Sequence, residues 1–321
     1  MLARSGVLVT TLLSIVVLAV AGCADGGGRD TDAFATVVDD AGRAVRVAAP
    51  PTRIISLIPA VTETIIALGA TDRLVARTAF DTDPTIAHLP STEQALIPNV
   101  EWLTRFRPEL VVAWADGRSR TVVERLGVIG VPVYGAAIET LDDVDATIRN
   151  LGRLLGLDAR ADSLADALAA ELDAVRGAVA GREPPSVFYL IGRDPVMTAG
   201  PGTFVDEVIT AAGGRNLFAD AASGWPQVSL EEIVHRQPDV LIVPLGEWNA
   251  PRAIEELRRA PGWRELRAVR EGRVYAVDAE TFNRPGPRMG QVARHLAGLL
   301  HGEAFSQDAS TDDSRTPEAA P

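Results

Sequence analysis

The sequence contains no lysine, one cysteine and four histidines. Without lysine it cannot form a phosphate-binding loop of the Gly-Lys type. With Cys23 as its single cysteine it cannot form an intramolecular disulfide. There is no Gly-x-Ser-x-Gly elbow, and no two histidines have the i, i+4 or short-loop spacing of zinc ligands (His88, His235, His295 and His301). We therefore expect neither catalytic residues nor a metal site, and a protein that is not an enzyme.

Acidic residues outnumber basic ones, with 43 Asp and Glu against 31 Arg, so that the formal net charge is −12. A negatively charged surface repels phosphate backbones and anionic lipid headgroups. Nucleic acid is therefore excluded as a partner, and any membrane attachment needs another cause.

The N-terminus supplies such a cause. Residues 7–22 are uncharged and too short to span a bilayer, which is typical of a signal peptide over residues 1–22. The stretch ends in Val-Ala-Gly-Cys and resembles a bacterial lipobox, which implies cleavage before Cys23 and lipidation of that residue. We predict an extracytoplasmic protein anchored to the cell membrane, with a flexible tether over 23–33 and a disordered tail over 305–321.

The region between these ends repeats itself. The stretch "RIISLIPAVTETIIALGA" reads as a buried strand, a loop with Pro59 at the first helical position, and a helix that stops at Gly69. "SVFYLIGRDPVMTAGPGTFVDEVITAAGG" repeats this order, with Glu207 in the place of Glu63. "LTRFRPELVVAW" and "IVHRQPDVLIVPLG" form a second matching pair. Alternating strands and helices predict two α/β lobes with parallel sheets, over residues 34–140 and 182–304.

Residues 141–181 connect the two halves. Two apolar stripes at helical spacing run through this segment, and the second predicts a helix of about 22 residues, or on the order of 33 Å. A helix of that length is as long as a small domain is wide. We expect it to bridge the lobes.

In this order, the motifs resemble the helical-backbone class of ABC-transporter substrate-binding proteins, which carry iron-siderophores, haem and cobalamin. The resemblance covers residues 34–300 and adds "AAGGRNLF" to the motifs above. It implies a ligand cleft between two lobes, little hinge motion, a monomer without a cofactor, and a permease with its ATPase as partners. An adhesive or structural lipoprotein would explain the anchor but not the paired acidic helix starts.

The resemblance also implies a role for Glu63 and Glu207. In this family a glutamate at a helix start in each lobe docks onto permease arginines, and we expect two exposed carboxylates at these places. Asp206 stands next to Glu207 and is an alternative in the second lobe.

The ligand prediction follows from two stretches that are similar to the cobalamin-binding members. "SGWPQVS" places Trp225 beside the ligand, and "AETFNRPGPRMG" places Glu280 and Arg284 there, while Trp114 ends a matching strand in "AWADGRS". The competing interpretations are that Glu280 and Arg284 pair with each other, and that either tryptophan belongs to the core.

The sequence also departs from those members. Gln94 or Ala95 stands where they have a tryptophan, and Ile191 replaces an aromatic residue. A ferric siderophore, favoured by Arg77 and Arg118, or haem with His88 as a ligand, therefore stays an alternative to a cobalamin-like corrinoid.

Overall fold

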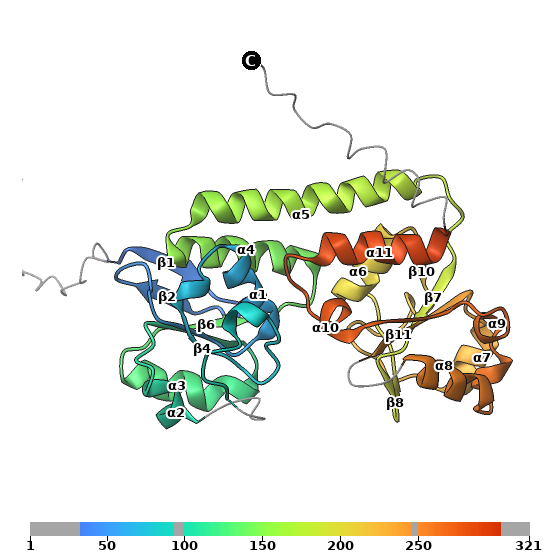
Figure 1. Cartoon of the computed structure of the whole chain (residues 1–321), viewed down its shortest axis with the longest axis horizontal. Coiled ribbons are helices and arrows are strands. Elements are labelled where there is room, and N and C mark those ends of the chain that lie inside the picture. Colours follow the sequence, from blue (N-terminus) through green and yellow to red (C-terminus); the bar gives the residue numbers. More distant parts are fainter. Residues whose placement is uncertain (1–32, 93–98, 246–249, 303–321) are drawn as a thin grey trace, which may run out of the picture. The chain divides into compact units, whose positions relative to one another are not determined.

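Two parallel sheets form the framework of the chain (Figure 1). The computed structural model describes residues 33–92, 99–245 and 250–302. The first sheet has the order β4-β3-β5-β6 and the second the order β10-β7-β11-β12. The strands are β3 (Ile54–Ser56), β4 (Leu74–Ala76), β5 (Leu110–Trp114) and β6 (Val133–Ala136), then β7 (Ser186–Tyr189), β10 (Arg215–Asn216), β11 (Val240–Leu245) and β12 (Val274–Asp278).

The two sheets have the same topology, because in each the first strand lies between the second and the third, and the fourth lies at the edge. A shared polar contact repeats with it. Glu109 accepts from the backbone N–H and the hydroxyl of Thr52, and Asp239 accepts from the same two groups of Ser186. The internal repeat read from the sequence is therefore a repeat of structure. We call each sheet with its flanking elements a lobe.

Helices and two hairpins complete the lobes. The hairpins are β1 (Ala35–Val38) with β2 (Ala44–Val47), and β8 (Gly192–Arg193) with β9 (Val196–Met197). The first lobe contains α1 (Pro59–Ala67), α2 (Val100–Thr104) and α3 (Arg120–Val128). The second contains α6 (Phe204–Ala211), α7 (Leu230–Arg236), α8 (Ala250–Arg259), α9 (Arg267–Arg270), α10 (Ala279–Phe282) and α11 (Met289–His301).

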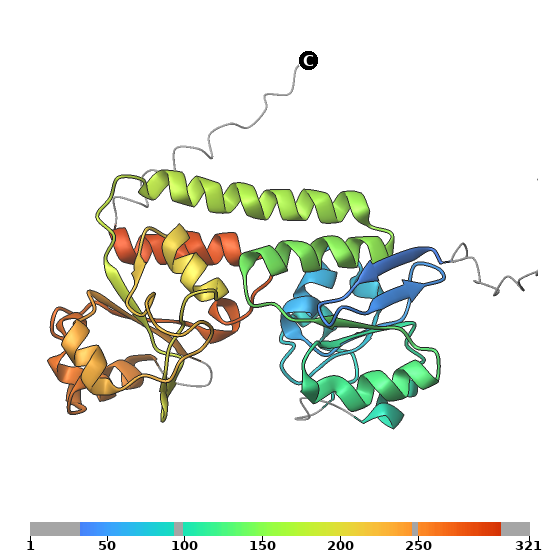
Figure 2. The same cartoon turned by 180° about the vertical axis from the view of Figure 1, so that it is seen from behind.

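Helices α4 (Leu141–Leu155) and α5 (Asp158–Val179) connect the lobes, and α5 packs along both α4 and α11 (Figures 1 and 2). Close packing depends on two glycines. A Cβ on Gly152 would lie 2.3 Å from Ala161 Cβ, and one on Gly290 would lie 2.3 Å from Glu171 Oε2. With 22 residues, α5 is the long bridging helix that the sequence predicts.

One hydrophobic core runs beneath these connecting helices and joins the lobes. It contains buried strand residues of both sheets, such as Ile54 and Val187, together with Leu168 and Leu172 of α5. Separate clusters cover the opposite faces, with α2 and α3 on the first sheet and α7, α8 and α9 on the second. Relative motion of the lobes would have to disturb the shared core. The predicted α/β fold with two lobes and a bridging helix is confirmed.

Several predictions concern residues that the structure does not describe. These are the signal peptide, Cys23 and the tether at one end, the tail at the other, and the positions Gln94 and Ala95. In the described part of the chain, no helix combines the length and apolarity needed to cross a membrane.

Candidate functional site

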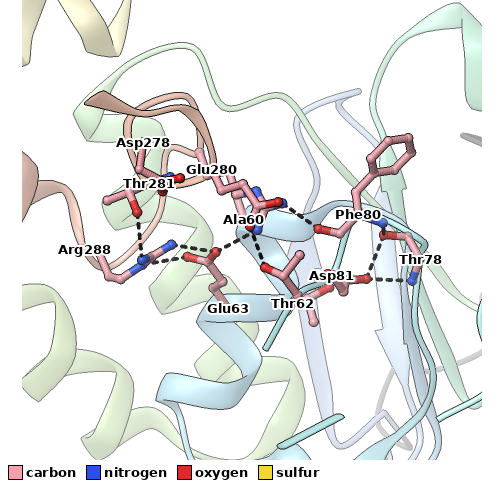
Figure 3. A network of polar contacts seen from close by, with 12 residues as sticks. Ala60, Thr62, Glu63, Thr78, Phe80, Asp81, Asp278, Glu280, Thr281 and Arg288 are labelled. Carbon is pink, nitrogen blue, oxygen red and sulfur yellow. Dashed lines mark hydrogen bonds and ion pairs between the residues drawn. The ribbon is translucent and has the colours of Figure 1, made fainter. Parts of the chain in front are cut away.

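The carboxyl ends of the parallel strands carry the loops in which ligands of open α/β folds bind. In the first lobe these are the loops after β4, β5 and β6, and in the second the loops after β7 and β12. Polar contacts cross from lobe to lobe here, from the segment after β12 to the loop after β4 and to α1, which follows β3 (Figure 3). The candidate site lies along these contacts.

Residues 279–288, which follow β12, form the most connected part of the site. Asp278 caps α10 by accepting from the backbone N–H of Thr281, and α10 ends after one turn at Asn283. Two prolines then prevent the helix from continuing until α11 begins. The buried Tyr189 anchors the segment, because its hydroxyl donates to Asn283 Oδ1 over 2.8 Å. Glu280 and Arg284 are thereby held on a fixed turn.

Arg284 belongs to the second lobe but bonds mainly to the first. Its Nη2 donates to the carbonyl oxygen of Phe80 over 2.5 Å, and its Nη1 lies 3.3 Å from Glu63 Oε1. Its distance to Glu280 is 3.6 Å, while Glu280 accepts from the Thr82 hydroxyl over 2.7 Å. The predicted alternative of a Glu280–Arg284 pair is therefore present, within a larger network. Only 14% of the Arg284 side chain is exposed.

Glu63 sits at the centre of the same network (Figure 3). Helix α1 begins at Pro59, as the sequence predicts, and its apolar residues face the core, so Glu63 points the other way. Its carboxylate accepts from Arg288 Nη2 over 2.8 Å and from Arg288 Nε over 3.0 Å. The structure thus differs from the predicted exposed carboxylate, since 17% of the side chain is exposed and two arginines bind it.

Glu207 is bonded as well. Its Oε2 accepts from the backbone N–H of Leu141, the first residue of α4, over 2.6 Å. The neighbouring Asp206 accepts from Asn216 Nδ2 over 2.8 Å, within its own lobe. Asp206 and Glu207 are therefore both hydrogen-bonded within the chain. The docking role of Glu63 and Glu207 stays a prediction.

Trp225 lies in the loop before α7. Its ring meets Phe204 edge to face at 5.7 Å, and its Nε1 donates to Glu139 Oε2 of the first lobe over 3.3 Å. The Phe204 backbone N–H donates to the Glu139 carbonyl over 2.6 Å. Trp225 is half-buried and packs against the shared core. The predicted alternative of a core tryptophan therefore holds for the buried part of its ring.

Trp114 ends β5 and is also half-buried. The Arg118 guanidinium lies 5.5 Å from its ring centroid and donates to Asp116 over 2.5 Å, which lowers the pKa of that carboxyl. The Arg118 side chain is 63% exposed, and its ion pair with Asp116 lies at the surface. Arg77 instead donates to two backbone carbonyls of its own loop, and these bonds stabilise the loop after β4.

Sequence reasoning missed several residues of the site. Phe80 is a large apolar side chain with 43% exposure on the loop after β4. Arg288, Glu139 and Thr82 each bond across the lobes. The second arginine of the "RPGPR" motif was a signal for Arg288, whereas nothing local marks the other three.

A pocket of about 410 Å³ adjoins the network, with both lobes in its lining. The lining residues are Glu63, Ile66, Ala67, Thr82, Asp83, Pro84, Pro287 and Arg288. Among the described residues no three His, Cys, Asp or Glu side chains are grouped to hold a metal ion. His88 and His235 are exposed, and His295 and His301 contact Phe282 and the Ala212 carbonyl respectively.

Known proteins share this architecture. The periplasmic binding protein family matches residues 54–281. The vitamin B12-binding protein of Vibrio cholerae serotype O1 is 31% identical over 241 residues, which cover 74% of this chain and 85% of that protein. An ABC transporter substrate-binding lipoprotein of Bacillus subtilis is 29% identical over 95% of this chain and 99% of its own length. A periplasmic haem-binding protein from Roseiflexus superposes with a TM-score of 0.69 at 31% identity, covering 79% of this chain and 98% of that one.

Proposed function

The chain belongs to the periplasmic binding protein family and is a substrate-binding protein of the ABC import type, not an enzyme; on this premise we propose that it captures a cobalamin-like corrinoid. In the proposal it is held outside the cell membrane by a lipid on Cys23 and passes the ligand to its permease as a monomer. Its similarity over 95% of the chain to a substrate-binding lipoprotein supports the anchor.

One observation carries the ligand proposal. Each lobe carries partly exposed aromatic side chains at or after its strand ends, with Phe80 after β4 and Trp114 at the end of β5 in the first lobe, and Trp225 in the loop before α7 in the second. Between the lobes lie Glu280 and Arg284, which can accept from and donate to amide groups. A large ring with amide side chains at its rim fits flat apolar walls and polar groups at the edge. The similarity to a vitamin B12-binding protein supports the same ligand class.

A second candidate is haem or a ferric siderophore. Ile191, two residues after the end of β7, is 37% exposed, and a corrinoid cleft would gain from an aromatic wall at this position. Arg118 is exposed near Trp114 and can pair with carboxylate or catecholate oxygens. A haem-binding protein is also among the similar structures.

The test is calorimetry of the purified protein with cyanocobalamin, haemin and a ferric hydroxamate siderophore in parallel. We expect saturable binding of cyanocobalamin at micromolar concentration or below. Binding of haemin or the siderophore without binding of cyanocobalamin would refute the corrinoid proposal and leave the import function in place.

Permease docking is the second part of the proposal. Besides Glu63 and Glu207, the internal repeat offers a matched pair, Glu101 and Glu231, each seven residues before the proline that precedes a central strand. Both lie in the first turn of a capped helix, the Glu101 side chain is 70% exposed, and Glu231 is also exposed. Glu101 has one ion pair, with the 61% exposed Arg125 at 3.5 Å, and solvent screens an exposed pair of this kind, so that meeting a basic partner costs it little.

Charge reversal separates the two pairs. Glu101→Arg with Glu231→Arg is compared with Glu63→Arg with Glu207→Arg, in cells that carry the importer and in purified protein. The docking pair is the one whose reversal abolishes uptake and leaves ligand affinity unchanged. If uptake survives both double reversals, docking through paired glutamates is wrong.

A further inference from the structure

Glu63 and Glu207 occupy equivalent places in the two lobes, and each reaches the start of a helix beyond its own lobe's sheet. Glu63, on α1 of the first lobe, binds Arg288, the N-cap residue of α11. Glu207, on α6 of the second lobe, accepts from the backbone N–H of Leu141, where α4 leaves the first lobe. The two contacts are therefore reciprocal.

We infer that these contacts are two clasps that set the separation of the lobes before a ligand arrives, which makes Glu63 and Glu207 positioning residues of the binding cleft. The first clasp is the Glu63–Arg288 pair and the second is the Glu207–Leu141 bond. The inference deepens the proposed function, because the cleft that the clasps position is the one proposed to take the ligand.

The first clasp is built as a strong contact. Two nitrogens of Arg288 meet the two oxygens of Glu63 at 2.8 and 3.0 Å, which is the bidentate geometry of the strongest ion pairs. The Glu63 side chain is 17% exposed, so water competes weakly for it. Arg288 also donates to the hydroxyl of Thr281, which ties the clasp to α10.

The second clasp combines charge with a helix terminus. The N-terminus of α4 carries partial positive charge, and the Glu207 carboxylate lies 2.6 Å from its first N–H. Thr140 and Asp143 form a capping box at the same terminus, so that end of α4 is fixed independently. The Phe204–Glu139 backbone bond crosses the junction beside it.

Each clasp adjoins a proposed ligand residue. Glu63 also lies 3.3 Å from Arg284, whose other bond holds the carbonyl of Phe80. Glu207 lies on the helix that begins with Phe204, the residue against which Trp225 packs. Opening the clasps would remove the carboxylate that Arg284 and Arg288 share, and would remove a cross-lobe contact from the helix that supports Trp225.

The clasps are tested first without ligand, on the full-length chain with Cys23→Ala. Spin labels replace Val128 on the first lobe and Arg270 on the second, both exposed, and pulsed electron resonance measures the distance distribution between them. We expect one narrow distribution, and a broader or shifted one in the double variant Glu63→Gln with Glu207→Gln. The matched control, Glu124→Gln with Glu265→Gln, changes one exposed carboxylate per lobe and should leave the distribution unchanged.

Binding supplies the second readout. In the same variants we expect the dissociation constant for cyanocobalamin to rise at least tenfold for the double clasp variant and less than twofold for the control. Thermal unfolding by circular dichroism confirms that each variant is folded at the temperature used. If the wild type does not bind cyanocobalamin, the corrinoid proposal fails, and the distance measurement still decides the clasps.

Two outcomes would overturn the inference. One is a distance distribution that is the same in the clasp variant and the control. The other is an unchanged cyanocobalamin affinity together with abolished uptake, which would assign Glu63 and Glu207 to docking instead.

Discussion

Replacing Arg288 with alanine should cost about 1–2 kcal/mol of unfolding free energy. A hydrogen bond to a charged group contributes roughly 1.5–3 kcal/mol, and Arg288 makes two such bonds to Glu63. The expected loss is smaller than the sum of two such bonds, because 39% of the Arg288 side chain is exposed and solvent screens the pair. Glu63 also keeps Arg284 at 3.3 Å, so its charge is not left unpaired.

Urea unfolding at neutral pH measures this loss. Since one core joins both lobes, we expect a single transition, and a midpoint that falls in Arg288→Ala with little change in slope. The difference should shrink in about 1 M salt, where the screening length is roughly 3 Å. The matched control is Arg258→Ala, a 52% exposed arginine 4.0 Å from Glu255, which should lose less than about 0.5 kcal/mol.

An Arg288→Ala variant that is no less stable than Arg258→Ala would contradict this expectation. Such a result would mean that the bidentate contact contributes nothing beyond an ordinary surface pair. A loss that persists undiminished in high salt would point instead to the packing of the Arg288 stem against α1.

Three further predictions concern the anchor, the ligand and pH. Cys23→Ala should move the mature protein out of the membrane fraction or stall its processing, and normal processing at the membrane would contradict lipidation. Corrinoid titration should quench tryptophan emission, and Trp225→Ala should weaken binding by roughly 1–3 kcal/mol, as calorimetry would show, if the protein keeps its thermal stability. Burial lowers the pKa of His301, whose ring bonds the Ala212 carbonyl. The unfolded chain then binds more protons, so stability should fall as pH drops from 7 to 5, and His301→Gln should flatten that slope in urea unfolding.

Much of the fold could be predicted because it depends on local patterns. The apolar spacing in residues 53–70 places a strand, Pro59 and a helix in the observed order. The 22 residues of α5 follow from an apolar stripe of the right period. The repeated Pro-Glu and Pro-Asp motifs mark the same step into a central strand in both sheets. Each of these signals lies within a few residues of the structure it determines.

The partners of the site residues could not be predicted in this way. Glu63 and Arg288 are 225 residues apart, and Glu207 and Leu141 are 66 apart. A helix start with an acidic residue looks the same in sequence whether its carboxylate faces solvent or another lobe. Local spacing indicates the place of Glu63 on its helix, and only the tertiary arrangement determines what lies opposite.

The internal repeat explains why the sequence leaves two pairs of glutamates to choose from. Duplicated topology places Glu63 opposite one helix start and Glu207 opposite another, and it also places Glu101 and Glu231 at matching helix starts. Each pair has one glutamate in each lobe, at equivalent positions of the repeat. The repeat alone therefore cannot show which pair binds a partner. Bonding differs between them, because the first pair holds cross-lobe contacts and the second pair is exposed. A charge used to fix the cleft is less available to a partner, and this favours separate residues for the two tasks.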